Sequence, residues 1–215
     1  GRTRVLGLVV PDISNPFFTD LSKGVNDAAL KRGYAVMLCN TDADSEKESQ
    51  LLDVLSSQKV QGILITPARD NNKSLASLDS QHIAISLVDR EAVGIKACSV
   101  GVNDSAGGAL AFNHLYELGH RDIVVITGAA NIPQVSDRDE GIKLANQALS
   151  KNQRANLITY RVNQMNSITA ATLVKQLILE KGLFFTAMIC GNDLIALGAI
   201  RALREHNLEV PKDVS

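Results

Sequence analysis

The chain has 215 residues, of which 45% are hydrophobic and 21% are charged. This composition is typical of a soluble globular protein, and the length allows one large domain or two small ones. The 22 basic and 23 acidic residues give a net charge of −1, which excludes the positive charge excess typical of nucleic-acid-binding domains. No apolar run approaches the length of a membrane span, and Asp12 interrupts the first apolar run too early for a signal peptide.

Short apolar runs alternate with stretches of helical periodicity along the whole chain. Several runs are continuously hydrophobic, which is typical of strands that are covered on both faces in a parallel sheet. The predicted strands are 5–10, 34–39, 60–66, 83–88, 98–102, 123–127, 157–162 and 185–190.

The segments between these strands carry apolar stripes at helical spacing. The stripes are Phe18, Leu21, Val25 and Ala29; Leu51, Leu52 and Leu55; Leu110, His114, Leu115 and Leu118; and Ile195, Ala199, Ile200 and Leu203. The glycine-rich stretch "SAGGALA" lies inside a helical run, so it indicates close helix packing rather than a phosphate-binding loop. This alternation predicts an α/β fold with doubly wound parallel sheets and right-handed crossovers.

The strand predicted at 98–102 breaks the alternation. It follows the strand at 83–88 with no room for a crossover helix, and the β–α pattern then restarts near Asn103. We therefore predict two doubly wound parallel-sheet lobes, 1–102 and 103–215.

Cys39, Cys98 and Cys190 each lie in an apolar, strand-like run. An odd number of cysteines in such positions predicts buried free thiols in a reducing compartment rather than a disulfide framework. A cytoplasmic protein is therefore expected.

Two adjacent phenylalanines follow the first predicted strand. Asn15 fits a helix N-cap, and Pro16 fits the first helical position, where its missing N–H has no cost. Phe18 belongs to the apolar stripe and is expected in the core. Phe17 faces the polar side of the helix at the carboxyl end of a strand, where ligands of open parallel sheets bind, so we predict that its ring faces a ligand.

Several motifs resemble the regulatory domain of LacI/GalR-family transcription regulators. They are "GLVVPDISNPFF", "GYAVMLCNTD", "VQGILITP", "LVDR", "ELGHRDIVVITG", "DRDEG", "CGNDLIALGAIRALRE" and "EVPKDVS". The resemblance covers about residues 3 to 215. It implies the type I periplasmic-binding-protein-like fold, shared with ribose-type sugar-binding proteins, in which two lobes clamp a ligand. It also implies a sugar-responsive regulator that forms a homodimer.

Transferred to matching positions, the resemblance implies ligand-binding residues in both lobes. They are Asn15, Phe17, Phe18, Asp89 and Arg90 in the first lobe and Arg138, Asn192 and Asp193 in the second. Where some relatives have an aromatic residue from the second lobe, this chain has Asn163 or Gln164. The pattern is similar to that of ribose-binding relatives, so a pentose or a related sugar is the first ligand expected.

These residue types suit a sugar because each hydroxyl can donate and accept a hydrogen bond. Asp89 can accept, the guanidinium groups of Arg90 and Arg138 can donate, and Asn192 can do both. Hydrogen bonds to charged groups contribute about 1.5–3 kcal/mol each. Simpler roles remain open: a solvated turn for Asp89 and Arg90, a helix-surface ion pair of Arg138 with Asp137 or Glu140, and an N-cap role for Asn192.

The sequence offers no pattern for an enzyme. It has no Walker A or GxGxxG motif, its histidines are isolated, and no Ser or Cys has a base at a recognisable spacing. We therefore expect no catalytic residue, no metal and no cofactor.

The resemblance also implies segments that this chain lacks. Family members carry an N-terminal helix-turn-helix head, so operator DNA is an expected partner only through that head. A membrane is not expected as a partner. A C-terminally incomplete second lobe with an unpaired sheet edge is expected too. The alternative functions are a periplasmic sugar-binding protein of a transporter and, third, an enzyme on the same scaffold.

Overall fold

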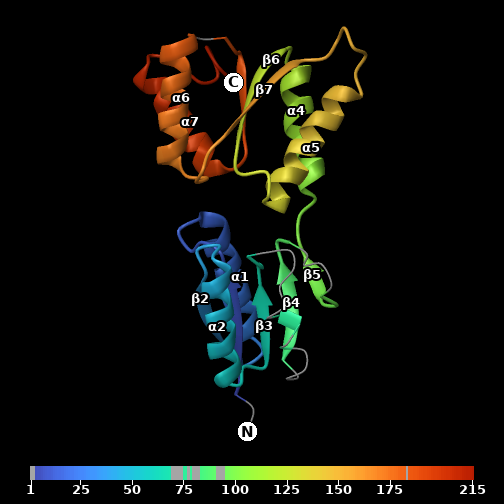
Figure 1. Ribbon diagram of the computed structural model, residues 1–215, viewed down its shortest axis with the longest axis vertical. Coiled ribbons are helices and arrows are strands. Elements are labelled where there is room, and N and C mark those ends of the chain that lie inside the picture. The colour runs from blue at the N-terminus through green and yellow to red at the C-terminus, as the bar shows by residue number, and fades with distance from the viewer. Residues whose placement is uncertain (1–2, 69–74, 77, 79–82, 91–94, 183) are drawn as a thin grey trace. The chain divides into compact units, whose positions relative to one another are not determined.

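The computed structural model describes residues 3–68, 75, 76, 78, 83–90, 95–182 and 184–215. The chain divides into two compact units, Gly1–Val102 (unit 1) and Asn103–Ser215 (unit 2). Each unit is a parallel sheet with helices packed on it (Figure 1). The α/β fold class with two parallel-sheet lobes is therefore confirmed.

Unit 1 contains a five-stranded sheet with the strand order β2-β1-β3-β4-β5. All neighbouring strands pair in parallel. The described elements are β1 (Val5–Val10), α1 (Pro16–Leu30), β2 (Ala35–Asn40), α2 (Ser45–Ser57), β3 (Gly62–Ile65), β4 (Ala84–Val88) and β5 (Cys98–Val100).

The core of unit 1 lies on both faces of this sheet because successive residues of a strand point to opposite faces. Leu8 and Val10 of β1 cluster with Phe18 of α1. Val9, between them, clusters instead with Leu52 and Leu55 of α2. Helices α1 and α2 thus cover opposite faces, which explains why β1 is continuously hydrophobic.

Unit 2 contains a three-stranded parallel sheet with the order β7-β6-β8. Its elements are α4 (Asp104–Glu117), β6 (Asp122–Thr127), α5 (Pro133–Gln147), β7 (Asn156–Arg161), α6 (Ser167–Lys181), β8 (Ala187–Cys190) and α7 (Asp193–Glu205). β8 is the last strand of this sheet. On its outer side, the backbone N–H of Ser215 donates to Thr186 O, and Ser215 O accepts from the Met188 N–H. This outer side of β8 is therefore paired at one position.

Two clusters form the core of unit 2, one on each face of the sheet. Ile123 and Val125 of β6 pack with Phe112 of α4, whereas Val124 and Ile126 pack on the face that carries α6 and α7. Figure 1 shows α4 and α5 on one side of the strands and α6 and α7 on the other.

Two glycines allow α4 and α5 to touch through their backbones. A Cβ added to Gly108 would lie 2.1 Å from Arg138 O, and one added to Gly141 would lie 1.9 Å from Ser105 O. Neither distance leaves room for a methyl group. The close helix packing predicted for "SAGGALA" is confirmed.

The eight predicted strands are all present in the described residues, with ends that differ by at most two positions. The stripe predicted on α4 is wrong, because Leu110 and Leu118 are 70% and 62% exposed. The buried face contains Asp104, Gly108, Phe112 and Leu115 instead. The backbone contact at Gly108 determines this face, and hydrophobicity alone did not reveal it.

The prediction of three buried thiols is also wrong at one position. Cys39 is buried and Cys190 is partly buried, but Cys98 is exposed. Cys98 belongs to β5, the last strand of its sheet, whose three residues are all exposed. All three cysteines are free thiols.

Candidate functional site

The start of α1 forms as the sequence predicted, with Phe18 buried beneath it. Asn15 Oδ1 accepts from the Phe17 N–H at 3.1 Å, and Pro16 occupies the first helical turn. Phe18 is 7% exposed and packs in the core, whereas Phe17 is 47% exposed. The two rings meet edge to face, with centroids 5.0 Å apart. The Phe17 ring therefore packs against Phe18 on one side and is exposed to solvent on the other, near the carboxyl end of β1.

Hydrogen bonds also shape the loop between β1 and α1. Asp12 Oδ1 accepts from both the N–H and the hydroxyl of Ser14, at 2.8 and 2.6 Å. Asn40, the last residue of β2, accepts from the Ile13 N–H at 2.9 Å. These contacts tie the loop that carries Asn15 and Phe17 to the neighbouring strand.

Asp89 and Arg90 follow β4 at the same edge of the sheet. Asp89 has a positive φ of 66°, a conformation that Asp tolerates better than most residues. Its N–H donates to Val100 O at 2.8 Å. The Arg90 guanidinium donates to Pro67 O at 2.6 Å. Because Arg90 binds the segment after β3, the solvated-turn alternative does not describe it.

Arg138 of α5 is held by two acceptors in unit 2. Its Nε and Nη2 atoms both lie 2.7 Å from Asp104 Oδ1, and its Nη1 donates to Gly191 O at 2.7 Å. The Asp104 carboxylate is 7% exposed, so it forms a largely buried ion pair with Arg138. These acceptors replace Asp137 and Glu140, the partners considered from the sequence.

Asn192 caps α7, as one of the simpler interpretations expected. Its Oδ1 accepts from the Ile195 N–H at 2.8 Å, and its Nδ2 donates to Met165 O at 3.1 Å. Asp193 follows as an exposed residue in the first turn of α7. Arg138 binds the carbonyl of Gly191, the residue before Asn192, so the structure brings Arg138, Asn192 and Met165 together.

Asn163 is exposed and lies after β7. Its neighbour Gln164, also exposed, accepts from Asn166 Nδ2 at 3.0 Å. Among the described residues, no hydrogen bond or ion pair joins Asn163 to Arg138 or Asn192, so the structure does not place it in their group.

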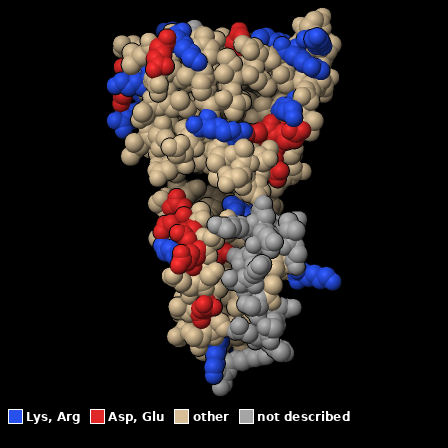
Figure 2. Space-filling model, viewed as in Figure 1, with Lys and Arg blue, Asp and Glu red and all other residues tan. Residues whose placement is uncertain are grey.

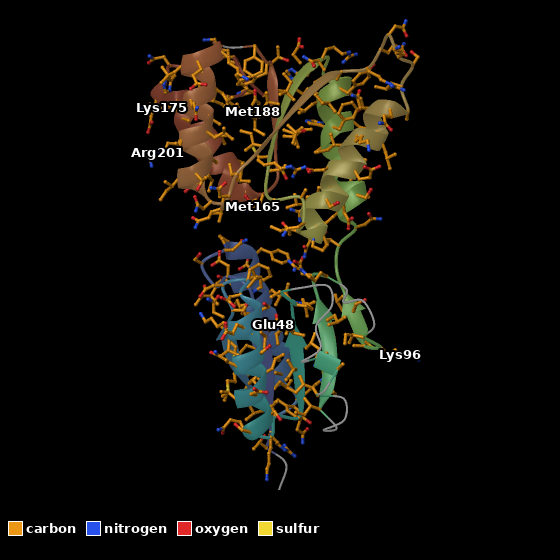
Figure 3. All side chains as sticks on the ribbon, viewed as in Figure 1. Glu48, Lys96, Met165, Lys175, Met188 and Arg201 are labelled. Atoms are coloured by element: carbon orange, nitrogen blue, oxygen red, sulfur yellow. The ribbon has the colours of Figure 1, made fainter. Side chains whose placement is uncertain are left out.

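Met165 is a residue that the sequence prediction missed. A Cβ on Gly128 would lie 2.5 Å from its Sδ, and a Cβ on Gly191 would lie 3.3 Å from its Cε. Its thioether therefore covers the glycines that follow β6 and β8. Met165 is labelled in Figure 3. The sequence feature that could have indicated a covering side chain is the pair of glycines at equivalent strand ends.

Arg161, the last residue of β7, was also missed. It donates to Gly128 O at 2.8 Å and to Asp139 Oδ2 at 2.7 Å. A charged residue that ends a strand gives little sequence signal because it fits an exposed strand end equally well. With Arg138, it supplies a second guanidinium at the carboxyl end of this sheet.

Other sites find little support in the described part of the chain. No group of three or more His, Cys, Asp and Glu side chains is arranged there to hold a metal ion. None of the described helices is both long and apolar enough to cross a membrane. On the face of unit 2 seen in Figure 2, acidic and basic side chains are interspersed.

A hollow of about 520 Å³ lies in unit 1, away from Phe17 and Arg90. It is bounded by α1 and by the strands β1, β3 and β4, and its lining includes Leu6, Val25, Leu64 and Ala84. This lining is mainly apolar and includes one charged residue, Arg32.

The sequence matches a family described as periplasmic binding proteins and sugar binding domain of the LacI family, over residues 3–215. The HTH-type transcriptional repressor PurR of Aliivibrio fischeri is 31% identical over 99% of this chain. The ribose operon repressor of Halalkalibacterium halodurans is 31% identical over 98% of this chain. The chain spans 63% and 60% of the lengths of these two relatives.

Among solved structures, a LacI family transcriptional regulator from Enterococcus faecium with bound ribose superposes with a TM-score of 0.85. It is 28% identical, and the alignment covers 98% of this chain and 75% of that chain.

Proposed function

We propose that this chain, which belongs to the family of periplasmic binding proteins and LacI sugar-binding domains, is the effector-binding part of a transcription regulator. Its effector is a small sugar, with ribose as the first candidate. The parent protein acts in the cytoplasm as a homodimer and binds operator DNA through a separate helix-turn-helix head. Two relatives named as transcriptional repressors support the regulator role.

The observation that carries the proposal is a guanidinium held at the carboxyl end of each parallel sheet. Arg90 is bound to Pro67 O in unit 1, and Arg138 is bound to Asp104 and Gly191 O in unit 2. Open parallel sheets bind ligands at these strand ends. Pre-oriented guanidinium groups lose less freedom when they donate to a sugar hydroxyl.

The other residues complete the proposed site. Asp89 and Asp193 accept from sugar hydroxyls, and Phe17 and Met165 contact the apolar C–H groups of the sugar ring. Asn15 and Asn192 act mainly through the helix starts that they cap, and Phe18 braces Phe17. Asn163 is an exposed contact from the second unit.

Isothermal titration calorimetry with pentoses, hexoses and purines tests the proposal. We expect D-ribose or a related pentose to bind, and we expect Asp89→Ala to abolish the heat of binding because a charged acceptor is lost. Asp137→Asn, at an exposed position of α5, serves as the control. Folded protein that binds no member of the panel contradicts the sugar assignment.

A periplasmic sugar-binding protein remains the second candidate because the family description covers both classes. The coding sequence upstream of residue 1 distinguishes them. A helix-turn-helix there supports the regulator, and a secretion signal supports the transport protein.

A further inference from the structure

A carboxylate lies inside unit 1 where the pattern of its helix would suit an apolar side chain. Glu48 of α2 is 0% exposed. It shares the inward face of α2 with Leu52 and Leu55, which are 1% and 0% exposed. Its neighbours Glu46 and Lys47 are exposed. A leucine at position 48 would continue the stripe, so packing alone does not explain a glutamate here.

Glu48 binds the segment that follows β3. Its Oε2 accepts from the Ala68 N–H at 2.6 Å. The carbonyl of the same peptide unit, Pro67 O, accepts from Arg90 Nη1 at 2.6 Å. One peptide bond is therefore held between a carboxylate on its N–H side and a guanidinium on its carbonyl side.

The charges of these groups favour this arrangement. Burial raises the pKa of Glu48, while the Ala68 N–H and the positive charge of Arg90 act in the opposite direction. A peptide that donates to a carboxylate is polarised so that its carbonyl becomes a better acceptor, and hydrogen bonds in such chains strengthen one another. The ionised Glu48 thus favours the observed Arg90 geometry in two ways, by charge attraction and through the peptide.

We infer that Glu48 is a positioning residue, which fixes the Arg90 guanidinium at the sugar-binding edge of unit 1 through the Pro67–Ala68 peptide. The inference rests on the proposed function, since it assigns Glu48 a role in sugar recognition. Glu48 itself does not contact the sugar. Figure 3 labels Glu48 among the side chains of unit 1.

The test compares three variants of the full chain. Glu48→Leu removes the bond to Ala68 and the charge, and it keeps the apolar stripe. Glu48→Gln keeps an oxygen acceptor for the Ala68 N–H and removes only the charge. Glu46→Gln changes an exposed carboxylate on the same helical turn and serves as the matched control.

Two measurements are made on each variant. Calorimetry gives the Kd for D-ribose. NMR relaxation of the ligand-free protein gives the mobility of the Arg90 guanidinium, whose signals are assigned by their loss in Arg90→Lys. Thermal unfolding identifies any variant that does not fold, and Glu48→Gln decides the question if Glu48→Leu is unfolded.

We expect Glu48→Leu to raise the Kd for D-ribose about tenfold, Glu48→Gln to raise it less, and Glu46→Gln to leave it unchanged. The mobility of the Arg90 guanidinium should increase most in Glu48→Leu, less in Glu48→Gln, and not at all in Glu46→Gln. Unchanged Arg90 mobility in the folded Glu48 variants overturns the inference, even if the Kd rises, because Glu48 would then act through general packing. The two proposals can fail separately. If the wild type binds no sugar but Arg90 becomes more mobile in the Glu48 variants, the proposed function is contradicted and the positioning of Arg90 by Glu48 is supported.

Discussion

Arg138 shows how one side chain can connect a helix, a buried carboxylate and a strand end. Its guanidinium group contacts Asp104 at the start of α4 and the Gly191 carbonyl after β8. A lysine is a point charge on a flexible stem and cannot reproduce both contacts with the same geometry. The arginine is therefore suited to present its remaining N–H groups in a fixed direction.

We predict that Arg138→Lys weakens D-ribose binding by about 1.5–3 kcal/mol, the size of a hydrogen bond to a charged group. Calorimetry measures the change, with Asp137→Asn on the same helix as the control. Equal affinities of Arg138→Lys and the wild type would show that Arg138 is a structural residue only.

The thiols should differ strongly in reactivity. Burial raises the pKa of Cys190 to about 12, so its thiol stays protonated at neutral pH, and only the thiolate is a good nucleophile. Cys98 is exposed and Cys39 is buried. Titration of the native protein with a thiol reagent at pH 8 should give one rapid equivalent, and Cys98→Ser should remove it. Two or more rapid equivalents would contradict the low reactivity expected of Cys39 and Cys190.

Glu48 should make stability depend on pH. Its folded pKa is raised above the ordinary value of 4.5, so the native state binds more protons than the unfolded state between these two values. Stability then falls as the pH rises through this window. Glu48→Gln lacks this titration. The free energy of unfolding of Glu48→Gln minus that of the wild type should therefore increase from pH 4 to pH 7. Urea unfolding at several pH values measures the difference, and a decrease over this range would contradict the predicted sign.

At the scale of elements, apolar runs and helix starts carried most of the information. The runs at 5–10 and 123–127 are hydrophobic throughout because helices cover both faces of β1 and β6. Asn15 and Pro16 marked the start of α1 correctly. The inward face of α4 was predicted wrongly, since it depends on the residues that α5 brings against Gly108.

The contact between α4 and α5 gives a prediction with a matched control on the same helix. Gly108→Ala places a methyl group 2.1 Å from Arg138 O, whereas a Cβ on Gly107 meets nothing within 4 Å. We expect Gly108→Ala to lower the free energy of unfolding by about 3 kcal/mol through overpacking. Gly107→Ala should raise it by about 0.5–1 kcal/mol because alanine favours the helix. Chemical denaturation measures both, and similar values for the two variants would contradict the backbone contact.

At the scale of the whole molecule, each unit has core clusters of its own. The clusters around Phe112 and Val174 involve residues of unit 2 alone. We propose that residue 103 is a domain boundary and predict that a fragment of residues 103–215 folds on its own. Circular dichroism should show helical structure and a cooperative thermal transition. A fragment without such a transition would contradict an independent domain.

The sequence by itself determined the fold class, the eight strand positions, the cap of α1 and the family, because these depend on local periodicity and on motifs contiguous in the chain. It also identified Phe17, Arg90, Arg138 and Asn192 as residues at strand ends. Only the tertiary structure decided the partners of Arg90 and Arg138. The bonds of Arg138 to Gly191, of Arg90 to Pro67 and of Glu48 to Ala68 join residues 53, 23 and 20 positions apart. Such contacts form when the sheet brings separate strand ends to one edge, and no local pattern in the chain records which groups will meet there.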